Sequence, residues 1–326
     1  MKKTVSLLMV SLMILTLFTF AGCAKEEPTL NLGLGVYTSV SATDATEDKA
    51  GQGQATVTAA AVLVDGDGKI VKAFIDCADN KVGYTAEGTT VANDSFVTKY
   101  EAGTDYNMVA YGGAVKEWYE QADAFCALIV GKTADEVKAL VAENSKGTEE
   151  VLNAGCTIYV AEFAMAVEKA INNAVASTAT ANDTLKLGIS TTQTTADATE
   201  DKAGSNKVET TLFAAAIDSE GKITAAASDC LEVTFGFELD GKSTFDSAAE
   251  VLTKKEKGDG YGMKAYAGAA KEWYEQAAAF DAACIGKTAG EVAGLIAEDG
   301  KGNADLQAAG CTITVDSFVK AASKIG

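Results

Sequence analysis

The stretch KEWYEQA at residues 116–122 occurs a second time at residues 271–277. These two copies contain both tryptophans of the chain, Trp118 and Trp273. Three further runs are duplicated in the same order: DATEDKAG at 44–51 and 197–204, GKTA at 131–134 and 286–289, and AGCTI at 154–158 and 309–313. Self-similarity over most of a chain is typical of a unit that is built more than once. The sequence therefore predicts one module present twice.

Each predicted module begins with strands. Residues 55–64 and 69–77 are apolar and rich in β-branched side chains, and the Asp-Gly-Asp-Gly run at 65–68 between them is a strong hairpin signal. Residues 32–39 alternate weakly and are a third candidate strand. The second half repeats the hairpin, with strands at 211–217 and 222–227 around residues 218–221.

Helices follow the strands in each module. A helical apolar period covers residues 106–130, and capping boxes at Thr133 and Thr288 predict the start of a second helix. We also expect a short strand at 96–100, a strand at 155–160 and a closing helix at 161–174. The predicted fold class is α+β, with two tandem repeats, each a small antiparallel sheet with helices packed on one face.

Five segments are expected along the chain. Residues 1–23 resemble a bacterial lipoprotein signal peptide, with an apolar run at 5–21 that ends in Ala-Gly-Cys23, so Cys23 is the expected lipidation site. Residues 24–29 form a short tether, 30–178 the first module, 179–182 a polar linker and 183–326 the second module. We expect an exported protein held at the extracellular face of the cell membrane by its lipid. We also expect each module to fold alone.

The composition excludes several kinds of chemistry. The chain has neither histidine nor arginine, because all 27 basic residues are lysines. A Ser-His-Asp triad and a His-ligated metal or haem are therefore excluded, and we expect no metal site. The net charge of −19 becomes −21 when Lys2 and Lys3 leave with the signal peptide. Such a charge disfavours nucleic acid as a partner.

Six cysteines remain once Cys23 is assigned to the lipid, three in each predicted module. An odd number in each module argues against complete internal pairing. One Cys77–Cys156 type of disulfide in each module is an alternative. Free buried cysteines that pack as small apolar residues are the preferred interpretation.

Two duplicated runs are candidate binding sites. Trp118 and Tyr119, with Trp273 and Tyr274 in the second copy, could form an aromatic wall for a planar ligand, or Trp118 could anchor the core while Tyr119 covers its edge. The carboxylates of residues 44–51 could bind a hard cation, although their spacing does not match an EF-hand loop. A solvated loop is the preferred interpretation of that run.

The third candidate is the AGCTI run, in which Gly155 and Cys156 precede Thr157. Glycine allows a tight bend, and the threonine hydroxyl is then accessible at that bend. Gly310, Cys311 and Thr312 are the same residues in the second copy. The alternative is that each threonine only opens a strand.

The chain resembles the duplicated FMN-binding lipoproteins of Gram-positive extracellular electron transfer, of the pheromone-lipoprotein type. The runs that carry the resemblance are Gly-Met-Lys-Ala-Tyr at 262–266, Lys-Glu-Trp-Tyr-Glu-Gln, Gly-Lys-Thr-Ala-x-Glu-Val and Cys-Thr-Ile-x-Val, and they extend over both halves. In that family a flavin transferase attaches FMN through its phosphate to a threonine. The resemblance implies Thr157 and Thr312 as the acceptors.

The commoner attachment signal of that family reads Asp-x-x-Ser/Thr-Gly-Ala-Thr. Its glycine matches Gly155 and Gly310, whereas its alanine position holds Cys156 and Cys311 and its Ser/Thr position holds Ala154 and Ala309. Its aspartate position holds Val151 and Leu306, with Glu150 and Asp305 one residue upstream.

The resemblance implies an exported, membrane-anchored electron carrier with FMN on each module, rather than an enzyme. A flavin supplies its own redox chemistry, so a chain without histidine or arginine can serve it. The implied partners are a flavin transferase, a membrane electron donor and an extracellular acceptor. The alternative is a non-catalytic surface lipoprotein that binds a ligand or a protein through its Trp/Tyr helix.

Overall fold

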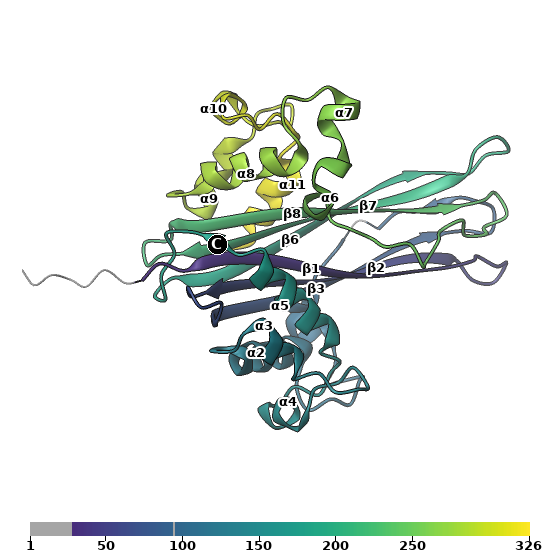
Figure 1. Cartoon of the computed structure of the whole chain (residues 1–326). Helices are drawn as coiled ribbons and strands as arrows, with labels where there is room; N and C mark the ends of the chain where they lie inside the picture. Colours follow the sequence, from purple (N-terminus) through teal and green to yellow (C-terminus); the bar gives the residue numbers. More distant parts are fainter. Residues whose placement is uncertain (1–27, 94) are drawn as a thin grey trace, which may run out of the picture.

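Two antiparallel sheets lie face to face, and each has its helices on its outer side (Figure 1). The computed structural model describes residues 28–93 and 95–326. The expected signal peptide, Cys23 and residues 24–27 of the tether lie outside the described residues. Within those residues, no helix has both the length and the apolar character needed to cross a membrane.

The first sheet has the strand order β4-β3-β2-β1-β5 and the second has the order β6-β7-β8. The strands are β1 (Asn31–Thr43), β2 (Gly51–Val64), β3 (Ile70–Tyr84), β4 (Thr90–Val91), β5 (Val175–Ala176), β6 (Thr184–Ala196), β7 (Gly204–Ile217) and β8 (Ile223–Phe237). The predicted hairpins are confirmed, and their strands are longer than expected. Asp65 Oδ1 closes the first turn by accepting hydrogen bonds from the backbone N–H groups of Asp67 and Lys69, both at 2.9 Å.

The helices occupy the two outer layers. Those after the first sheet are α1 (Lys99–Ala102), α2 (Trp118–Ile129), α3 (Ala134–Lys138), α4 (Glu149–Ala154) and α5 (Ala161–Asn172). Those after the second sheet are α6 (Lys254–Lys257), α7 (Met263–Ala267), α8 (Trp273–Cys284), α9 (Ala289–Val292), α10 (Ala304–Ala308) and α11 (Asp316–Ser323). The α+β class and the capped starts of α3 and α9 are therefore confirmed. Short 3-10 turns complete the helical segments at Gly103–Tyr106, Gly258–Tyr261 and Ala293–Leu295.

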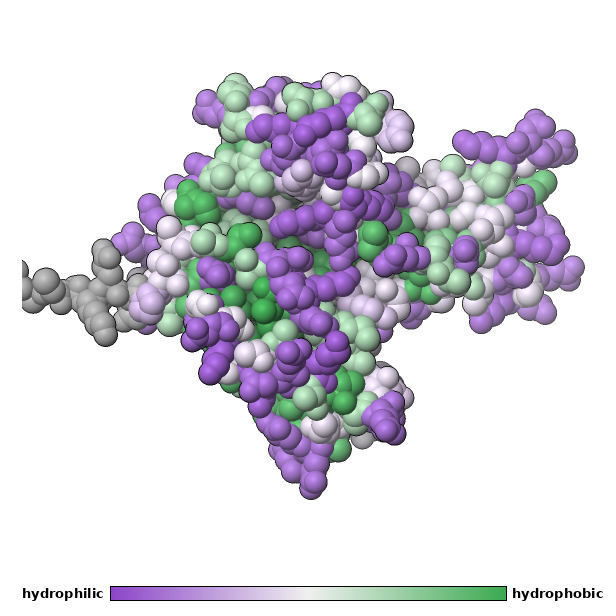
Figure 2. Space-filling view, in the orientation of Figure 1, coloured by the Kyte–Doolittle hydropathy of each residue, from purple (hydrophilic) through white to green (hydrophobic). Residues whose placement is uncertain are grey.

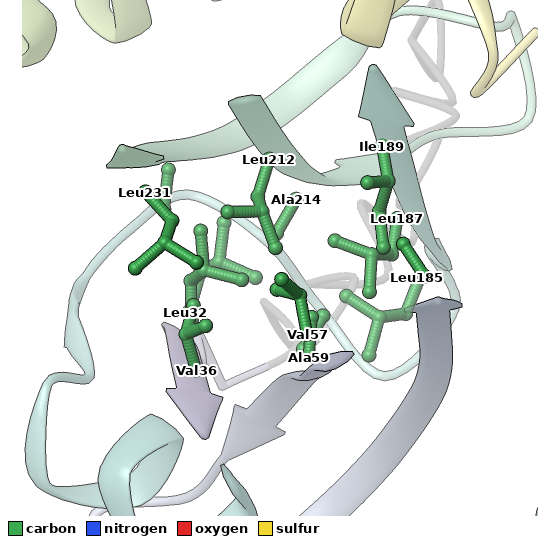
Figure 3. Close-up of a cluster of buried hydrophobic side chains, with 14 of the residues drawn as sticks. Leu32, Val36, Val57, Ala59, Leu185, Leu187, Ile189, Leu212, Ala214 and Leu231 are labelled. Carbon is green, nitrogen blue, oxygen red and sulfur yellow. The ribbon is translucent and has the colours of Figure 1, made fainter. Parts of the chain in front are cut away.

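The inner faces of the two sheets form one shared apolar core. Alternate residues of β1 and β2, among them Leu32 and Val57, point toward Leu187 and Leu212 of the second sheet (Figure 3). All four are buried, and each such side chain contributes about 1.5–3 kcal/mol when it is fully buried. The opposite faces of the same strands pack against the helices and form a separate core in each half.

The duplicated DATEDKAG loops fasten each half to the other. The Asp44 carboxylate accepts the backbone N–H of Ser243 at 2.8 Å, and the Asp197 carboxylate accepts the backbone N–H of Thr90 at 2.7 Å. Between the two loops, the Tyr84 and Phe237 rings stack at 4.4 Å with an interplanar angle of 4°.

These loops therefore have a structural explanation. Within the described residues no group of three or more Cys, Asp or Glu side chains could hold a metal ion. The six cysteines are buried and free, so the Cys77–Cys156 disulfide alternative is wrong.

Two predicted strands are wrong, and one predicted helix is shorter than expected. Residues 96–98 form no strand, and Lys99 begins α1, because the Thr98 hydroxyl caps this helix by accepting the N–H of Glu101. Residues 107–117 form a loop, so the helix predicted over 106–130 is limited to Trp118–Ile129. Residues 155–160 are not a strand, since only Tyr159 pairs, in an isolated bridge with Lys146.

The segment predicted as a linker is anchored on both sides. Ala179 is buried, and its carbonyl accepts the N–H of Leu30 at 2.8 Å. The Thr178 hydroxyl donates to the carbonyl of Thr224 in β8 at 2.7 Å. This anchoring and the shared core lead us to expect that the two halves unfold together, which replaces the expectation of independent folding.

We predict that Trp118→Phe and Trp273→Phe variants, each with one remaining tryptophan in one half, have coincident denaturation midpoints. Leu212→Ala should lower the free energy of unfolding by about 2–5 kcal/mol and should lower both midpoints together, because Leu212 lies in the shared core. Tryptophan fluorescence during urea titration measures both effects. Two separated midpoints would show that the halves are independent cooperative units.

Candidate functional site

Charged and polar side chains of the duplicated KEWYEQ stretch make hydrogen bonds to the neighbouring loops in each half. The Glu117 carboxylate accepts the N–H groups of Met108 and Val109, at 2.8 and 3.3 Å, and so shapes the loop before α2. Glu120 accepts the N–H of Glu117 at 2.8 Å and completes a capping box. Glu272 and Glu275 make the same contacts in the second half. These contacts fix where each helix begins, at Trp118 in α2 and at Trp273 in α8.

Gln121 connects this helix to the predicted acceptor threonine. Its side chain is 1% exposed, and its Oε1 accepts both the backbone N–H of Thr157 at 2.8 Å and the Thr157 hydroxyl at 3.0 Å. Its Nε2 donates to the carbonyl of Lys116 at 3.0 Å, so the amide orientation is fixed. The Thr157 side chain is exposed while its hydroxyl proton is directed inward. Its oxygen lone pairs are therefore available toward solvent.

The second half repeats this arrangement with the same distances. Gln276 Oε1 accepts the Thr312 N–H at 2.8 Å and the Thr312 hydroxyl at 3.0 Å. Lys271 Nζ donates to the carbonyl of Ala309 at 3.0 Å, beside Gly310. Lys116 Nζ lies beside Gly155 in the first half. A lysine ammonium group therefore lies beside the glycine that is two residues before each exposed threonine.

The glycine and the cysteine of the run have structural roles. Gly155 has a φ of 96° and Gly310 a φ of 95°, a left-handed conformation that favours glycine. Gly155 is the C-cap of α4, and Gly310 directly follows Ala309, the C-cap of α10. Cys156 and Cys311 are fully buried, and burial raises the pKa of each thiol to about 11. Both thiols are therefore protonated at neutral pH and are poor nucleophiles. The threonine hydroxyl is the reactive group that each bend presents.

A pocket of about 520 Å³ opens beside this bend in the first half. Ile158 and Tyr159, which directly follow Thr157, line it together with Trp118 and Met108. Polar groups converge from Thr58, Lys99 and Glu162, and the Thr58 hydroxyl donates to Glu162 at 3.2 Å. The wall is of mixed polarity, and a volume of this size is typical of a ligand site.

A nearly buried lysine borders the pocket. Lys99 Nζ lies 3.2 Å from Asp79 and also over the Tyr106 and Trp118 rings, 5.5 and 5.8 Å from their centroids. Lys254 has the same position in the second half, 5.8 Å from the Trp273 centroid, and pairs with Glu209 and Glu232 at 3.3 Å. Each lysine therefore supplies a positive charge at the edge of the aromatic residues.

The tryptophan and the tyrosine of the duplicated stretch lie in different surroundings. Trp118 and Trp273 are each 4% exposed and pack in the helix–sheet cores, where Trp118 meets Phe163 edge to face at 5.6 Å. Tyr119 packs near Tyr100, and the Tyr274 hydroxyl donates to Asp259 at 3.1 Å. Trp118 lines the pocket beside Thr157 but Tyr119 does not, so the structure favours the interpretation of Trp118 as a core anchor over a wall formed by the Trp/Tyr pair.

Sequence reasoning missed the groups that hold and surround the threonine: Gln121, Gln276, Lys116, Lys271, Lys99 and Lys254. Four of these six belong to the duplicated KEWYEQ stretch, and that duplication was the available signal. The aspartate of the usual attachment signal has no counterpart at the bend. Val151 and Leu306 are core residues, and Glu150 pairs instead with Lys132 at 3.1 Å.

A buried carboxylate fixes the helix that carries Lys99. Asp76 accepts the N–H groups of Cys77 at 2.6 Å and Tyr100 at 3.1 Å. Burial raises its pKa from 3.8 to about 7, against the lowering effect of hydrogen bonds from Thr98, Cys77 and Tyr100. Asp229 has the same role in the second half, and burial raises its pKa to about 6.

We predict that the free energy of unfolding falls as pH rises from about 4 to about 7. In that window the unfolded chain releases the Asp76 proton while the folded chain retains it, so a rise in pH stabilises the unfolded state relative to the folded state. Asp76→Asn should remove this contribution, whose limit is about 1.4 kcal/mol per pH unit for one proton. Urea denaturation at several pH values measures the slope. An unchanged slope in the variant would contradict the assignment.

We predict that Trp118→Ala lowers the free energy of unfolding by about 3–5 kcal/mol, because it leaves a cavity among buried aromatic rings. Tyr119→Ala on the neighbouring, half-buried position is the matched control and should cost less. Chemical denaturation of both variants makes the comparison. Equal losses would show that Trp118 is not a core anchor.

Three comparisons bear on the identity of the chain. No protein-family model matches it, no curated protein matches it, and no solved structure matches it.

Proposed function

We propose that the chain consists of two copies of one module and that each copy carries FMN, covalently bound to Thr157 in the first and Thr312 in the second. In this proposal the protein is exported, anchored by a lipid on Cys23 at the extracellular face of the cell membrane, and carries electrons. We propose an electron carrier in preference to an enzyme that acts on a substrate of its own. The likeness to FMN-binding lipoproteins supports this function.

The observation that carries the proposal is the duplicated threonine arrangement. Each hydroxyl is exposed, and its proton is held by a buried glutamine with the same distances in both halves. A threonine that only opened a strand would not need a buried amide dedicated to its hydroxyl, and no strand forms there. Attachment would form a Thr Oγ–P ester while the transferase breaks the phosphoanhydride bond of a flavin dinucleotide, so that a nucleoside monophosphate leaves and the hydroxyl proton passes to a base of the transferase. The alternative threonine role is therefore disfavoured.

The surroundings fit a phosphate and a flat ring. Lys116 and Lys271 lie beside the glycines next to the acceptors, and a lysine serves as a point charge for a phosphate in a chain that lacks arginine. The pocket beside Thr157 offers the Met108, Ile158 and Tyr159 side chains as apolar surface. FMN, when bound, would supply the redox chemistry, and the chain would bind, orient and tune it.

The charge and the anchor fit the partners that this function requires. A flavin transferase would load each threonine, a membrane donor would reduce the carrier and an extracellular acceptor would oxidise it. The negative charge of the exported chain disfavours nucleic acid. The competing function, a surface lipoprotein that binds through its Trp/Tyr helix, is weakened because both tryptophans are 4% exposed.

We predict that the protein coexpressed with a flavin transferase from its own source carries two equal FMN mass increments and stays yellow after denaturation. Thr157→Ala and Thr312→Ala should each remove one increment, and the double variant should carry none. Each substitution should cost about 1 kcal/mol or less, because the backbone N–H still satisfies the glutamine oxygen. Intact-mass measurement after denaturation decides the result.

Matched variants separate the acceptor from its surroundings. Thr314→Ala removes another exposed threonine two residues after Thr312 and should leave both increments. Thr157→Ser keeps a hydroxyl and should retain partial loading. A colourless wild-type protein would contradict flavin binding and favour the binding-lipoprotein function. Two mass increments on the double variant would contradict the assignment of Thr157 and Thr312 as acceptors but would not contradict flavin attachment itself.

A further inference from the structure

The two proposed flavin sites lie on opposite sides of the paired sheets. Thr157 follows α4 and Thr312 follows α10, and these helices lie in the two separate outer layers (Figure 1). In Figure 2, apolar side chains gather in the middle of this face, between the two groups of helices. Each site therefore has its own surroundings, and a charged side chain can act on one site without lying in the other.

The cation and the indole ring beside the first site have counterparts in the second half. Lys99 and Trp118 line the pocket beside Thr157, and the same residue types recur as Lys254 and Trp273. Each ammonium lies 5.8 Å from the centroid of its tryptophan ring. These shared groups do not make the two sites different.

The charge of each of these lysines is balanced by carboxylates. Lys99 pairs with Asp79 at 3.2 Å. In the second half, two lysines and two carboxylates form one group: Lys207, Lys254, Glu209 and Glu232. Neither group has a net charge, so neither gives one site an electrostatic advantage over the other.

Glu162 adds a charge that is present at the first site only. It is the second residue of α5, it is half-buried, and it lines the pocket and accepts the Thr58 hydroxyl at 3.2 Å. No ion pair of the described residues includes it. Ser317 has the same position in α11, because α5 and α11 begin directly after Val160 and Val315.

Two other charged residues of α11 balance each other. Asp316 and Lys320 have the positions of Ala161 and Met165, which line the first pocket. Lys320 Nζ lies 2.6 Å from the Asp316 carboxylate, so this pair adds no net charge to the second site. The first site therefore carries one more negative charge than the second, and Glu162 is its source.

We infer that the two flavins have unequal reduction potentials and that Glu162 makes the potential of the flavin on Thr157 the lower one. This inference rests on the proposed function. When the membrane donor passes two electrons to a flavin and the flavin takes up one proton, its ring gains one negative charge. The Glu162 carboxylate repels that charge and disfavours the reduced form. In a partly reduced molecule the electrons therefore lie on the second flavin, and the first flavin is the stronger reductant.

The test compares two forms of the full exported chain, each loaded by the transferase. Thr312→Ala keeps only the first flavin and Thr157→Ala keeps only the second. Spectroelectrochemical titration at about pH 8, where carboxylates are ionised, measures each midpoint potential. The first should be lower by at least about 30 mV, which is a tenfold change in the ratio of oxidised to reduced flavin for a two-electron couple.

Variants at one position assign the difference to the carboxylate. In the Thr312→Ala protein, Glu162→Gln should raise the potential by at least about 30 mV, because glutamine still accepts the Thr58 hydroxyl but has no charge. Glu162→Asp keeps the charge and should keep the low potential. Glu162→Gln in the Thr157→Ala protein is the matched control and should leave the second flavin unchanged.

The inference is overturned if the two potentials are equal or reversed, if Glu162→Gln leaves the first potential unchanged, or if Glu162→Asp raises it as much as Glu162→Gln does. Circular dichroism of each variant confirms that it is folded, and intact mass confirms that it is loaded. A protein without mass increments would contradict the proposed function itself. Failure of the proposed function and failure of this inference alone are therefore distinguishable.

Discussion

The structure depends on the burial of two apolar sheet faces against each other. Leu32, Val57, Leu187 and Leu212 alternate with side chains that face the helices, so each strand is covered on both sides over this part of its length (Figure 3). Neither sheet has another surface in the described chain that could cover its inner face. Hydrophobic burial alone does not fix how the two halves are oriented. The loops that contain Asp44 and Asp197 fix this orientation, because each carboxylate accepts a hydrogen bond from the backbone of the opposite half.

The outer layers inherit their positions from these sheets. Gly35 of β1 lets the backbone of α5 approach closely, since a Cβ at Gly35 would overlap the carbonyl of Ala166. With α5 and α2 fixed on the sheet, Gln121 can be buried and still reach Thr157 in a loop that has no regular structure of its own. A reactive hydroxyl is thereby exposed on a bend whose position is set by buried, fully hydrogen-bonded groups.

The two halves keep one arrangement and change another. The threonine, glutamine, lysine and glycine are the same in both, which fits a function that each half performs. The contact between β3 and α2 contains Ile75 and Cys126, whereas the matching contact between β8 and α8 contains Ser228 and Asp281, and a pocket opens beside each contact.

The sequence by itself determined the class of the fold and suggested the two threonines of the proposed site. The hairpins at 65–68 and 218–221 and the capped starts of α3 and α9 followed from local patterns, because turns and caps are set by neighbouring residues. The free cysteines followed from the odd number of cysteines in each half. Thr157 and Thr312 were candidates because each follows a glycine bend in a duplicated run that resembles the attachment site of FMN-binding lipoproteins. Only the tertiary structure decided that the sheets share a core, that Trp118 is buried, that α2 starts at residue 118 and that Gln121 holds Thr157. These features depend on contacts between residues far apart in the chain. The hydrophobic period of an amphipathic stretch gives no information about such contacts.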